Sequence, residues 1–365
     1  MKRVSFLMLI TIACTFGVFA GTVPAGKEKP KKDEVLFSKD ELQRIITERK
    51  ATSFLLGKSK ESRNVEAWFF PGTSNNNALV IGGVHGSELS SIEVTRSLIR
   101  QLQRGKPSYY NVIVIPSLFP DNAMKAIDDP IQINSTSNIG RYSMPSAVDP
   151  NRQMPSPGKA FDEQMPLDHL GRRIEIENQL MLQLIQSFKP QRILNVHAIR
   201  NSDYGGIYAD PRTDEDGVAL GYSSDRDLAL AIATFIDERG GHVEGNHLEQ
   251  DPSALYYKDP EPVAAGFIQK RNMTGSVLNA NRGSGVSLGT WASTAVMDKN
   301  NPSKNRDAMR IITMEYPGCK RPADYGSKTQ QAFQEKQVVL FAAAIYEIFL
   351  GNYFVEKTVA DLVKK

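Results

Sequence analysis

The sequence ALVIGGVHGSELSS, residues 78–91, joins an apolar run, a glycine-rich turn and the start of a helix. The apolar residues 78–84 predict a strand. The glycines at 82, 83 and 86 predict a tight turn, because glycine adopts backbone angles that other residues avoid. Ser90 is of a type preferred at helix N-termini, and apolar residues recur at helical spacing from there to Arg104. The stretch therefore predicts a strand, a turn that carries His85 and Glu88, and a helix.

Strands and helices alternate along the rest of the chain. At Ser38 the pattern SKDE is a capping box that predicts a helix to about Lys50. Further helices are predicted over 90–104, 172–188, 225–239 and 330–350, and strands over 65–70, 78–84, 111–116, 192–197 and 310–317. Because several of these strands are wholly apolar, we expect an α/β fold whose sheet is covered by helices on both faces.

Two connections carry further predictions. PGTSNNN, residues 71–77, is rich in turn residues and predicts a hairpin between the strands at 65–70 and 78–84. Residues 117–171 are rich in Pro, Asn, Ser and Asp and predict a long irregular segment, a kind of loop that is usually functional or disordered. No repeat and no linker follows residue 36, so we expect one domain over 37–365.

Residues 1–20 predict a signal peptide and hence an exported, periplasmic or secreted protein. Two basic residues precede an apolar run that ends at Phe19, and small residues stand where a signal peptidase would cut. Residues 21–36 are rich in Lys and Pro and predict a tether. Two alternatives stay open. One is a membrane anchor, although the run is short for a bilayer span; the other is lipid attachment at Cys14, although Thr11 replaces the usual leucine.

The composition is that of a globular protein of nearly neutral charge. Of 365 residues, 41% are hydrophobic, and 44 basic residues face 41 acidic ones. Cleavage of the leader removes Lys2 and Arg3 and leaves 42 basic against 41 acidic residues, a net charge of about +1. No basic face with interleaved aromatic residues is present, so we expect no nucleic-acid partner. Only Cys319 survives cleavage, which excludes an internal disulfide in the mature chain.

Residues suited to a metal site stand at three predicted strand ends. His85 and Glu88 follow the strand at 78–84, and His197 and Glu315 stand at the ends of two later strands. In open α/β sheets, binding sites lie beyond the carboxyl ends of strands. A hydrolytic zinc site takes three ligands from His and carboxylate side chains and leaves one position for water. Two histidines and one glutamate meet that requirement.

Each of these residues also has a structural alternative. His85 and Glu88 could be ordinary polar residues of a surface turn. His197 could hydrogen-bond within the sheet, and Glu315 could pair with an arginine. Their joint placement favours a metal site, because the alternatives would have to explain each residue separately. The remaining histidines are weaker candidates, since no third ligand accompanies them in an apolar strand: His169, His242 and His247.

The order of four motifs resembles the zinc carboxypeptidases of the M14 type: GGVHGSE at 82–88, DPNRQMP at 149–155, LNVHAIR at 194–200 and ITMEYPG at 312–318. The resemblance covers most of residues 52–350. It looks closest to the murein peptide amidase branch because of three flanking stretches: LLGKSKESRNVEAWFFPG, YADPR and GSGVSLGTWAS. It implies a single-domain zinc carboxypeptidase-like fold with a mixed central sheet and one zinc ion per chain.

Carried over residue by residue, the resemblance makes His85, Glu88 and His197 the zinc ligands and Glu315 the general base. The chemistry fits, because zinc lowers the pKa of bound water to about 7 and polarises the scissile carbonyl. A carboxylate beside that water can take its proton and pass it to the leaving amine.

The resemblance also assigns the residues that would hold the substrate. Asn151 and Arg152 would grip the free carboxylate of its last residue, a task that suits a guanidinium because it makes two parallel hydrogen bonds. The alternative for Arg152 is a salt bridge within the loop. Arg141 is the best match for the family's arginine that stabilises the oxyanion, where a fixed positive charge meets developing negative charge.

The chain departs from the family pattern in two places. Pro150, Gln153 and Met154 surround the Asn-Arg pair where the family usually has other residues, which puts the loop shape in doubt. Many members carry a tyrosine shortly before the SLG segment, whereas Asn281 and Arg282 occupy that neighbourhood here. No tyrosine is therefore carried over as a residue that closes over the substrate.

The motifs and the leader together predict an exported zinc metallocarboxypeptidase or amidase. Its expected substrate is a peptidoglycan fragment, cleaved at the γ-D-Glu–diaminopimelate bond of the stem peptide. Two other hydrolases remain as alternatives: a general peptide carboxypeptidase, and an acyl-amino-acid deacylase of the succinylglutamate desuccinylase or aspartoacylase type. The leader argues against a deacylase of cytosolic metabolites. A wall-binding protein that lost its chemistry is a further alternative, and the presence of all four reactive residues argues against it.

Overall fold

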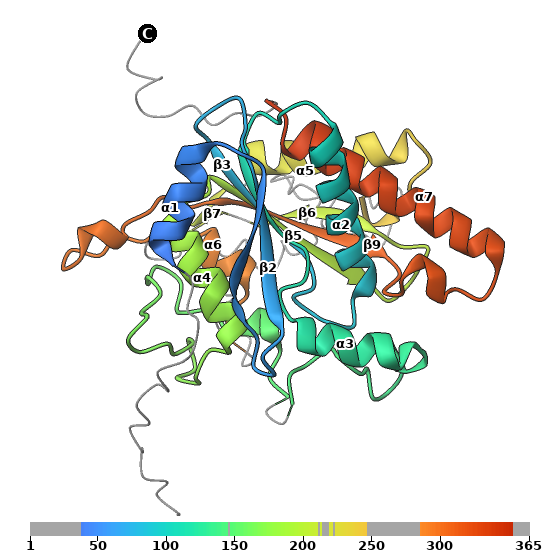
Figure 1. Ribbon diagram of the computed structural model, residues 1–365, viewed down its shortest axis with the longest axis horizontal. Coiled ribbons are helices and arrows are strands. Elements are labelled where there is room, and N and C mark those ends of the chain that lie inside the picture. Colours follow the sequence, from blue (N-terminus) through green and yellow to red (C-terminus); the bar gives the residue numbers. More distant parts are fainter. Residues whose placement is uncertain are drawn as a thin grey trace, which may run out of the picture. The chain divides into compact units, whose positions relative to one another are not determined.

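A seven-stranded mixed sheet lies at the centre of the fold, in the order β1-β2-β4-β3-β5-β9-β6 (Figure 1). The computed structural model describes residues 38–144, 147–210, 212–213, 219–221, 223–246 and 285–352. The strands of the sheet are β1 Thr52–Lys58, β2 Asn64–Phe70, β3 Asn77–Ile81, β4 Asn111–Ile115, β5 Arg192–Ile199, β6 Gly206–Ala209 and β9 Arg310–Pro317. A separate two-stranded ladder consists of β7 Arg212–Thr213 and β8 Ala219–Gly221.

The helices within the described residues are α1 Lys39–Glu48, α2 Leu89–Arg104, α3 Pro120–Asp128, α4 Ile176–Phe188, α5 Ser223–Asp237, α6 Leu288–Ala292 and α7 Lys328–Ala344. Short 3-10 turns are η1 Pro130–Gln132, η2 Pro150–Arg152, η3 Glu244–Asn246, η8 Pro302–Lys304 and η9 Pro322–Asp324, and a π-helical turn, η10 Ile345–Phe349, extends α7. The predicted helices at 90–104, 172–188, 225–239 and 330–350 are confirmed as α2, α4, α5 and α7. Ser38 accepts a hydrogen bond from the backbone of Glu41 and caps α1, as predicted.

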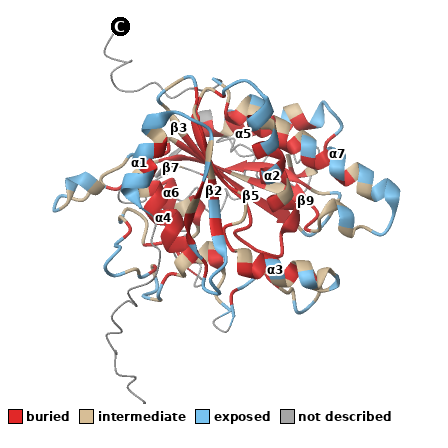
Figure 2. Cartoon of the chain, in the orientation of Figure 1, coloured by how far each residue is buried: buried red, intermediate tan, exposed pale blue. Residues whose placement is uncertain are grey.

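Helices cover both faces of the sheet, which confirms the α/β prediction. Successive side chains of a strand point to opposite faces. Val80 and Val112 therefore pack in one core with α2, α5 and α7, while Leu79 and Ile113 pack in another with α1, α4 and α6. Figure 1 shows α1 and α4 on one side of the strands and α2 and α7 on the other. Figure 2 shows the central strands almost wholly buried, as their continuous apolar runs require.

The predicted hairpin between β2 and β3 is wrong. β4 lies between these two strands, antiparallel to β2 and parallel to β3. The connection at 71–76 bonds to the segment that leads into β4: the backbone N of Thr73 donates to the carbonyl of Ser108 at 2.8 Å, and that of Ser74 donates to Tyr109 at 2.9 Å. A turn-rich composition predicts a reversal of the chain, but it does not identify the strand that pairs afterwards.

Several elements were not predicted, among them β1, α3, β6 and α6. β1 pairs antiparallel with β2 at the edge of the sheet. α3 lies inside the segment 117–171, which the sequence predicts as irregular. Pro120 occupies its first turn, a favourable place for proline, but the helix is only 9 residues long, so its apolar spacing repeats too few times to stand out in the sequence. The rest of that segment carries no further α-helix among its described residues.

Several predictions concern residues that the structure does not describe: the leader at 1–20 with Cys14, the tether at 21–36, His247, Asn281 and Arg282. All described residues belong to one unit, Val35–Lys365. Within them, no helix combines the length and the apolar character that crossing a membrane requires.

Glu177, in the first turn of α4, is a buried carboxylate whose ionisation opposes folding. It is 3% exposed and accepts a hydrogen bond from the backbone N of Lys60 at 3.1 Å. Burial raises the pKa of Glu177 from 4.5 to about 7. The folded protein thus holds this proton more tightly than the unfolded chain does. The stability from this site is fully present below pH 4.5 and is lost as the pH rises through 7.

We therefore expect Glu177→Gln to raise the free energy of unfolding by about 2 kcal/mol at pH 8 and to leave it nearly unchanged at pH 4. Urea denaturation at the two pH values measures this difference. Glu335→Gln, at an exposed position of α7, is the matched control and should have no effect at either pH. An equal gain from Glu177→Gln at both pH values would contradict the assigned cause.

Candidate active site

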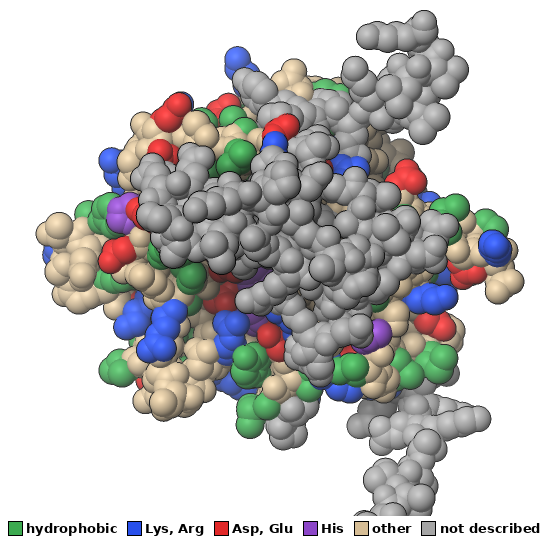
Figure 3. All heavy atoms as spheres, turned by 180° about the vertical axis from the view of Figure 1, so that it is seen from behind, with side chains coloured by type: hydrophobic (Ala, Val, Ile, Leu, Met, Phe, Trp, Pro, Cys, Tyr) green, Lys and Arg blue, Asp and Glu red, His purple; other side chains and the backbone are tan. Residues whose placement is uncertain are grey.

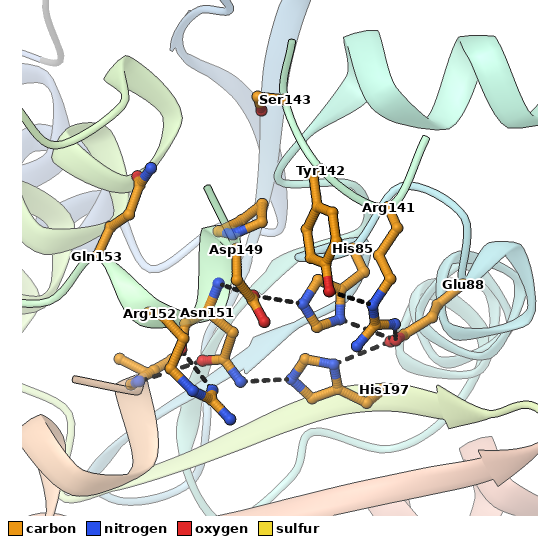
Figure 4. A network of polar contacts seen from close by, with 12 residues as sticks. His85, Glu88, Arg141, Tyr142, Ser143, Asp149, Asn151, Arg152, Gln153 and His197 are labelled. Carbon is orange, nitrogen blue, oxygen red and sulfur yellow. Dashed lines mark hydrogen bonds and ion pairs between the residues drawn. The ribbon is translucent and has the colours of Figure 1, made fainter. Parts of the chain in front are cut away.

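His85 and Glu88 follow β3, His197 lies near the end of β5, and the three residues meet at the carboxyl ends of these strands. These strands are parallel neighbours, so residues far apart in the chain come together at one edge of the sheet. One potential ligand atom from each lies within 4.8 Å of the others, and all three residues are buried. Nδ1 of His85 lies 2.8 Å from one carboxylate oxygen of Glu88, and Nδ1 of His197 lies 2.9 Å from the other (Figure 4). This is the only such three-residue group within the described part of the chain.

Glycine shapes the turn that carries the first two of these residues. Gly83 has a φ of 62°, in the left-handed region that glycine favours. A Cβ on Gly86 would lie 2.3 Å from backbone atoms of Asn122 and Ala123, so only glycine lets the start of α3 approach this closely. α2 begins one residue earlier than predicted, with Glu88 at its N-cap.

Asp149 contacts the edge of the His85 ring that faces away from Glu88. Its Oδ1 atom lies 2.8 Å from Nε2 of His85, the ring nitrogen that faces away from Glu88. A carboxylate in this place fixes the tautomer and orientation of a histidine that binds metal through its other nitrogen. Asp149 belongs to the DPNRQMP motif, but no role was predicted for it. The signal was available, because a metal-binding histidine needs an acceptor for its second nitrogen.

We expect Asp149→Ala to weaken zinc binding by about 10- to 100-fold without unfolding the protein. His85 would lose the acceptor that holds its ring, while the three predicted ligands would remain. Competition with a fluorescent chelator measures the affinity. Asp162→Ala removes an exposed aspartate that caps another turn in the same long segment, and it should leave zinc affinity unchanged. Equal affinities for wild type and Asp149→Ala would contradict this role.

The negative charge of Glu88 and the charges of the two histidines beside it influence each other's pKa values. Burial by itself would raise the pKa of Glu88, but His85 and His197 outweigh it and hold that pKa well below its usual range. Burial would lower the pKa of His85, yet Glu88 and Asp149 raise it to about 9. An ionised carboxylate between two imidazoles is a donor set that suits zinc, and the support from Asp149 adds to the fit.

Glu315 stands beside this group. It pairs with His197 in the parallel register of β5 and β9, so the two side chains leave the sheet on the same face. Burial, with a smaller contribution from Glu88, raises the pKa of Glu315 to about 7, although His197 acts in the opposite direction. Glu315 lines a cavity of about 700 Å³ that the three potential ligands also line. On the face drawn in Figure 3, histidine and acidic side chains meet near the middle.

Arg141 reaches the site from the long segment 117–171. Its guanidinium donates to Oε1 of Glu88 at 2.9 Å, and Tyr142 lies beside it (Figure 4). Burial would lower the pKa of the Arg141 guanidinium, but Glu88, Tyr142 and Asp149 together outweigh burial and raise that pKa above its usual value. The structure thus places a positive charge in the cavity next to the candidate metal ligands.

Asn151 and Arg152 line the same cavity. The side-chain amide of Asn151 lies 3.4 Å from Nε2 of His197, and its oxygen accepts from the backbone N of Leu288 at 3.2 Å. Arg152 donates to the carbonyl of Asn151 at 2.7 Å. Among the described residues Arg152 makes no direct ion pair with a carboxylate, although its charge acts on Asp149 in the same loop. Arg152 thus adds a positive charge to the cavity lining.

The residues that depart from the family pattern hold this loop in place. Pro150 begins the 3-10 turn η2, which Asp149 caps by accepting from the backbone N of Asn151 at 2.8 Å. The side-chain oxygen of Gln153 accepts from Asn178 at 3.1 Å, and Met154 is buried. Pro150, Gln153 and Met154 thus hold this loop in place through the turn η2, a hydrogen bond and burial.

The weaker histidine candidates join no metal group among the described residues. His169 lies 2.9 Å from the hydroxyl of Ser156. His242 packs against the ring of Phe333, with 4.9 Å between ring centroids.

The fold of this chain is similar to those of several proteins of known structure. No family model and no curated protein sequence matches the chain. It is similar to the murein-tripeptide amidase MpaA from Escherichia coli O157, at 16% identity and a TM-score of 0.38, over 79% of this chain and 91% of that one. It is also similar to the carboxypeptidase A from Helicoverpa armigera, at 14% identity and a TM-score of 0.42, over 86% of this chain and 74% of that one.

Proposed function

We propose that this protein is a zinc-dependent metallocarboxypeptidase that hydrolyses a C-terminal amide bond. One observation carries the proposal: His85, Glu88 and His197 form a compact group of potential ligands, and Glu315 faces the same cavity. Two histidines and a carboxylate are a ligand set of hydrolytic zinc sites. When bound, zinc lowers the pKa of water to about 7 and draws electrons from a carbonyl group.

Glu315 is the proton carrier in this proposal. Its carboxylate takes a proton from the water that attacks the carbonyl carbon, and the bond from that carbon to nitrogen then breaks. The proton passes to the leaving amine, so the products are a new carboxylate and a free amino acid. Register places Glu315 opposite His197, which keeps the base beside the ligand group.

Three further side chains bind and orient the substrate. Arg152 and Asn151 hold the carboxylate of its C-terminal residue, the group that distinguishes a carboxypeptidase substrate from an internal peptide bond. Arg141 meets the negative charge that develops on the carbonyl oxygen. All three line the cavity that contains Glu315.

We propose the stem peptide of peptidoglycan as the substrate, cleaved between γ-D-glutamate and diaminopimelate. Two features of the sequence support this choice: the stretches flanking the motifs, which resemble the murein peptide amidase branch, and the leader at 1–20, which would bring the enzyme to the compartment of the cell wall.

A product assay with the purified, zinc-loaded protein tests the proposal. The panel contains L-Ala-γ-D-Glu-meso-diaminopimelate, ordinary peptides with a free C-terminus, N-acetylaspartate and N-succinylglutamate. We expect release of diaminopimelate at a rate at least ~10-fold above that for the other compounds. Preferred cleavage of ordinary peptides would replace the wall substrate by general carboxypeptidase activity. Release of acetate or succinate would identify a deacylase, and no hydrolysis of any compound would refute the proposal.

A further inference from the structure

A second cavity of about 700 Å³ lies beside α6, apart from the candidate active site. Its walls come from the start of α1, the end of α4, α6 and the segment 303–309 that leads into β9. These three helices pack in one core on the same face of the sheet (Figure 1). α6 contributes to both cavities, since Gly289 and Thr290 line the candidate active site and Trp291 lines the second cavity. Among the described residues the two cavities share no lining residue, so a ligand in the second one would occupy a separate site.

The floor of the second cavity is apolar. Four side chains form it, each at most 4% exposed: Leu42, Ile185, Trp291 and Met309. The indole nitrogen of Trp291 donates to the carbonyl of Lys159 at 2.8 Å, which holds the ring in place. Pockets that bind small organic molecules are lined mainly by apolar and aromatic side chains, with a few polar groups that orient the ligand. The floor is therefore suited to the apolar body of such a molecule.

Arg306 provides the polar group at this floor. Its guanidinium lies over the Trp291 ring, 4.4 Å from the ring centroid, and Nη2 donates to the carbonyl of Trp291 at 2.8 Å. Nη1 donates to three further carbonyls, those of Thr294 at 2.8 Å, Ala292 at 3.1 Å and Asp307 at 3.3 Å. These contacts fix the position of the guanidinium. Its Nε atom makes no hydrogen bond within the described part of the chain and is left to donate to a ligand.

The positive charge of Arg306 has no counter-charge among the described residues. Burial lowers the pKa of the guanidinium to about 10, and no carboxylate acts in the opposite direction. An arginine nevertheless stays ionised at neutral pH, and the carbonyl groups that it contacts carry only partial charges. Charged groups removed from water are usually paired with an opposite charge, because an unpaired buried charge is costly. An anion bound in the cavity would supply that charge.

The other charged residues of the lining balance one another. Lys39 and Glu163 form an ion pair at 2.7 Å. Two more acids and two more bases are present: Asp40, Asp307, Lys189 and Lys304. The lining thus has four basic and three acidic residues, and Arg306 accounts for the difference of one. This surplus favours a ligand with a single negative charge.

We propose that the second cavity is a binding site for an organic monoanion, a carboxylate carried on an apolar body. The carboxylate accepts a hydrogen bond from Nε of Arg306, and such a bond between charged groups is among the stronger ones in proteins. The apolar body packs against Trp291 and the rest of the floor, and the removal of this surface from water stabilises the complex. The site uses none of the residues of the proposed reaction, so it does not depend on peptide hydrolysis.

Calorimetry with the zinc-loaded protein tests the site on three compounds: 4-phenylbutyrate, its uncharged amide 4-phenylbutyramide, and butyrate. The amide keeps the apolar body and lacks the charge, whereas butyrate keeps the charge and lacks the ring. We expect 4-phenylbutyrate to bind at least ~10-fold more tightly than either of the other two.

Variants assign this binding to the second cavity. Arg306→Gln removes the charge, and Ala308→Trp fills the cavity from its wall while the contacts of Arg306 remain. Each should weaken the binding of 4-phenylbutyrate by at least ~10-fold. Two controls should retain wild-type affinity. Ala323→Trp makes the same change at an exposed position outside the lining, and Arg152→Gln removes an arginine from the candidate active site.

Three results would overturn the inference: no binding of 4-phenylbutyrate, equal binding of 4-phenylbutyrate and its amide, or wild-type affinity in both cavity variants. Loss of affinity in Arg152→Gln alone would place the ligand in the candidate active site and would overturn it as well. Arg306→Gln also removes hydrogen bonds from the end of α6, so its folding is checked by circular dichroism. Where that variant does not fold, Ala308→Trp decides.

Discussion

Replacement of Glu315 by glutamine is expected to lower kcat by about 10³-fold while the zinc content stays at one ion per chain. Glutamine keeps the volume and an acceptor oxygen but does not take up a proton. The water would lose its base and the leaving amine its acid, while the three potential ligands would be untouched. Steady-state kinetics on a cleavable peptide, together with metal analysis of the same preparation, measures both quantities.

The matched control for this prediction is Glu335→Gln, the same chemical change at an exposed position of α7. It should retain wild-type kcat. Wild-type activity in Glu315→Gln would contradict the role of this residue as the base. Loss of zinc together with activity would instead make Glu315 a ligand.

Single replacement of His85 or His197 by alanine is expected to have the largest effect on metal binding. Each change leaves two of three protein ligands, and the other nitrogen of the removed ring no longer contacts Asp149 or Asn151. Zinc affinity should fall by more than ~100-fold, beyond the loss expected for the supporting carboxylate. Zinc should then be absent after dialysis, and elemental analysis of the dialysed protein checks this.

His169→Ala is the matched control because it removes a histidine from the same domain at a position outside the ligand group. It should keep one zinc ion per chain. If His85→Ala and His197→Ala also retained the wild-type zinc content, the site as described here would be refuted.

The placement of the reactive residues could be predicted because it follows from a rule of topology. Apolar strands that end in His or Glu place those residues at one edge of a sheet. The structure brings His85, Glu88 and His197 to that edge, and the register of β5 and β9 sets Glu315 beside them. The residues at three predicted strand ends were therefore enough to predict which side chains form the site.

Features that depend on pairing between distant segments could not be predicted. The insertion of β4 between β2 and β3 follows from backbone hydrogen bonds that local turn composition does not encode. The contact of Asp149 with His85 depends on the fold of a long irregular segment. Asp210 enters the cavity of the candidate active site only because β6 pairs with the edge of β9 that lies away from β5, and no strand was predicted over 206–209.

The central claim is tested most directly by hydrolysis in ¹⁸O-labelled water. Zinc-loaded protein is incubated with L-Ala-γ-D-Glu-meso-diaminopimelate, and the products are weighed by mass spectrometry. We predict unlabelled diaminopimelate and an L-Ala-D-Glu dipeptide with one ¹⁸O in its new carboxylate, and about 10³-fold slower formation of both products with Glu315→Gln protein. Intact, unlabelled tripeptide after incubation with the zinc-loaded wild type would contradict it.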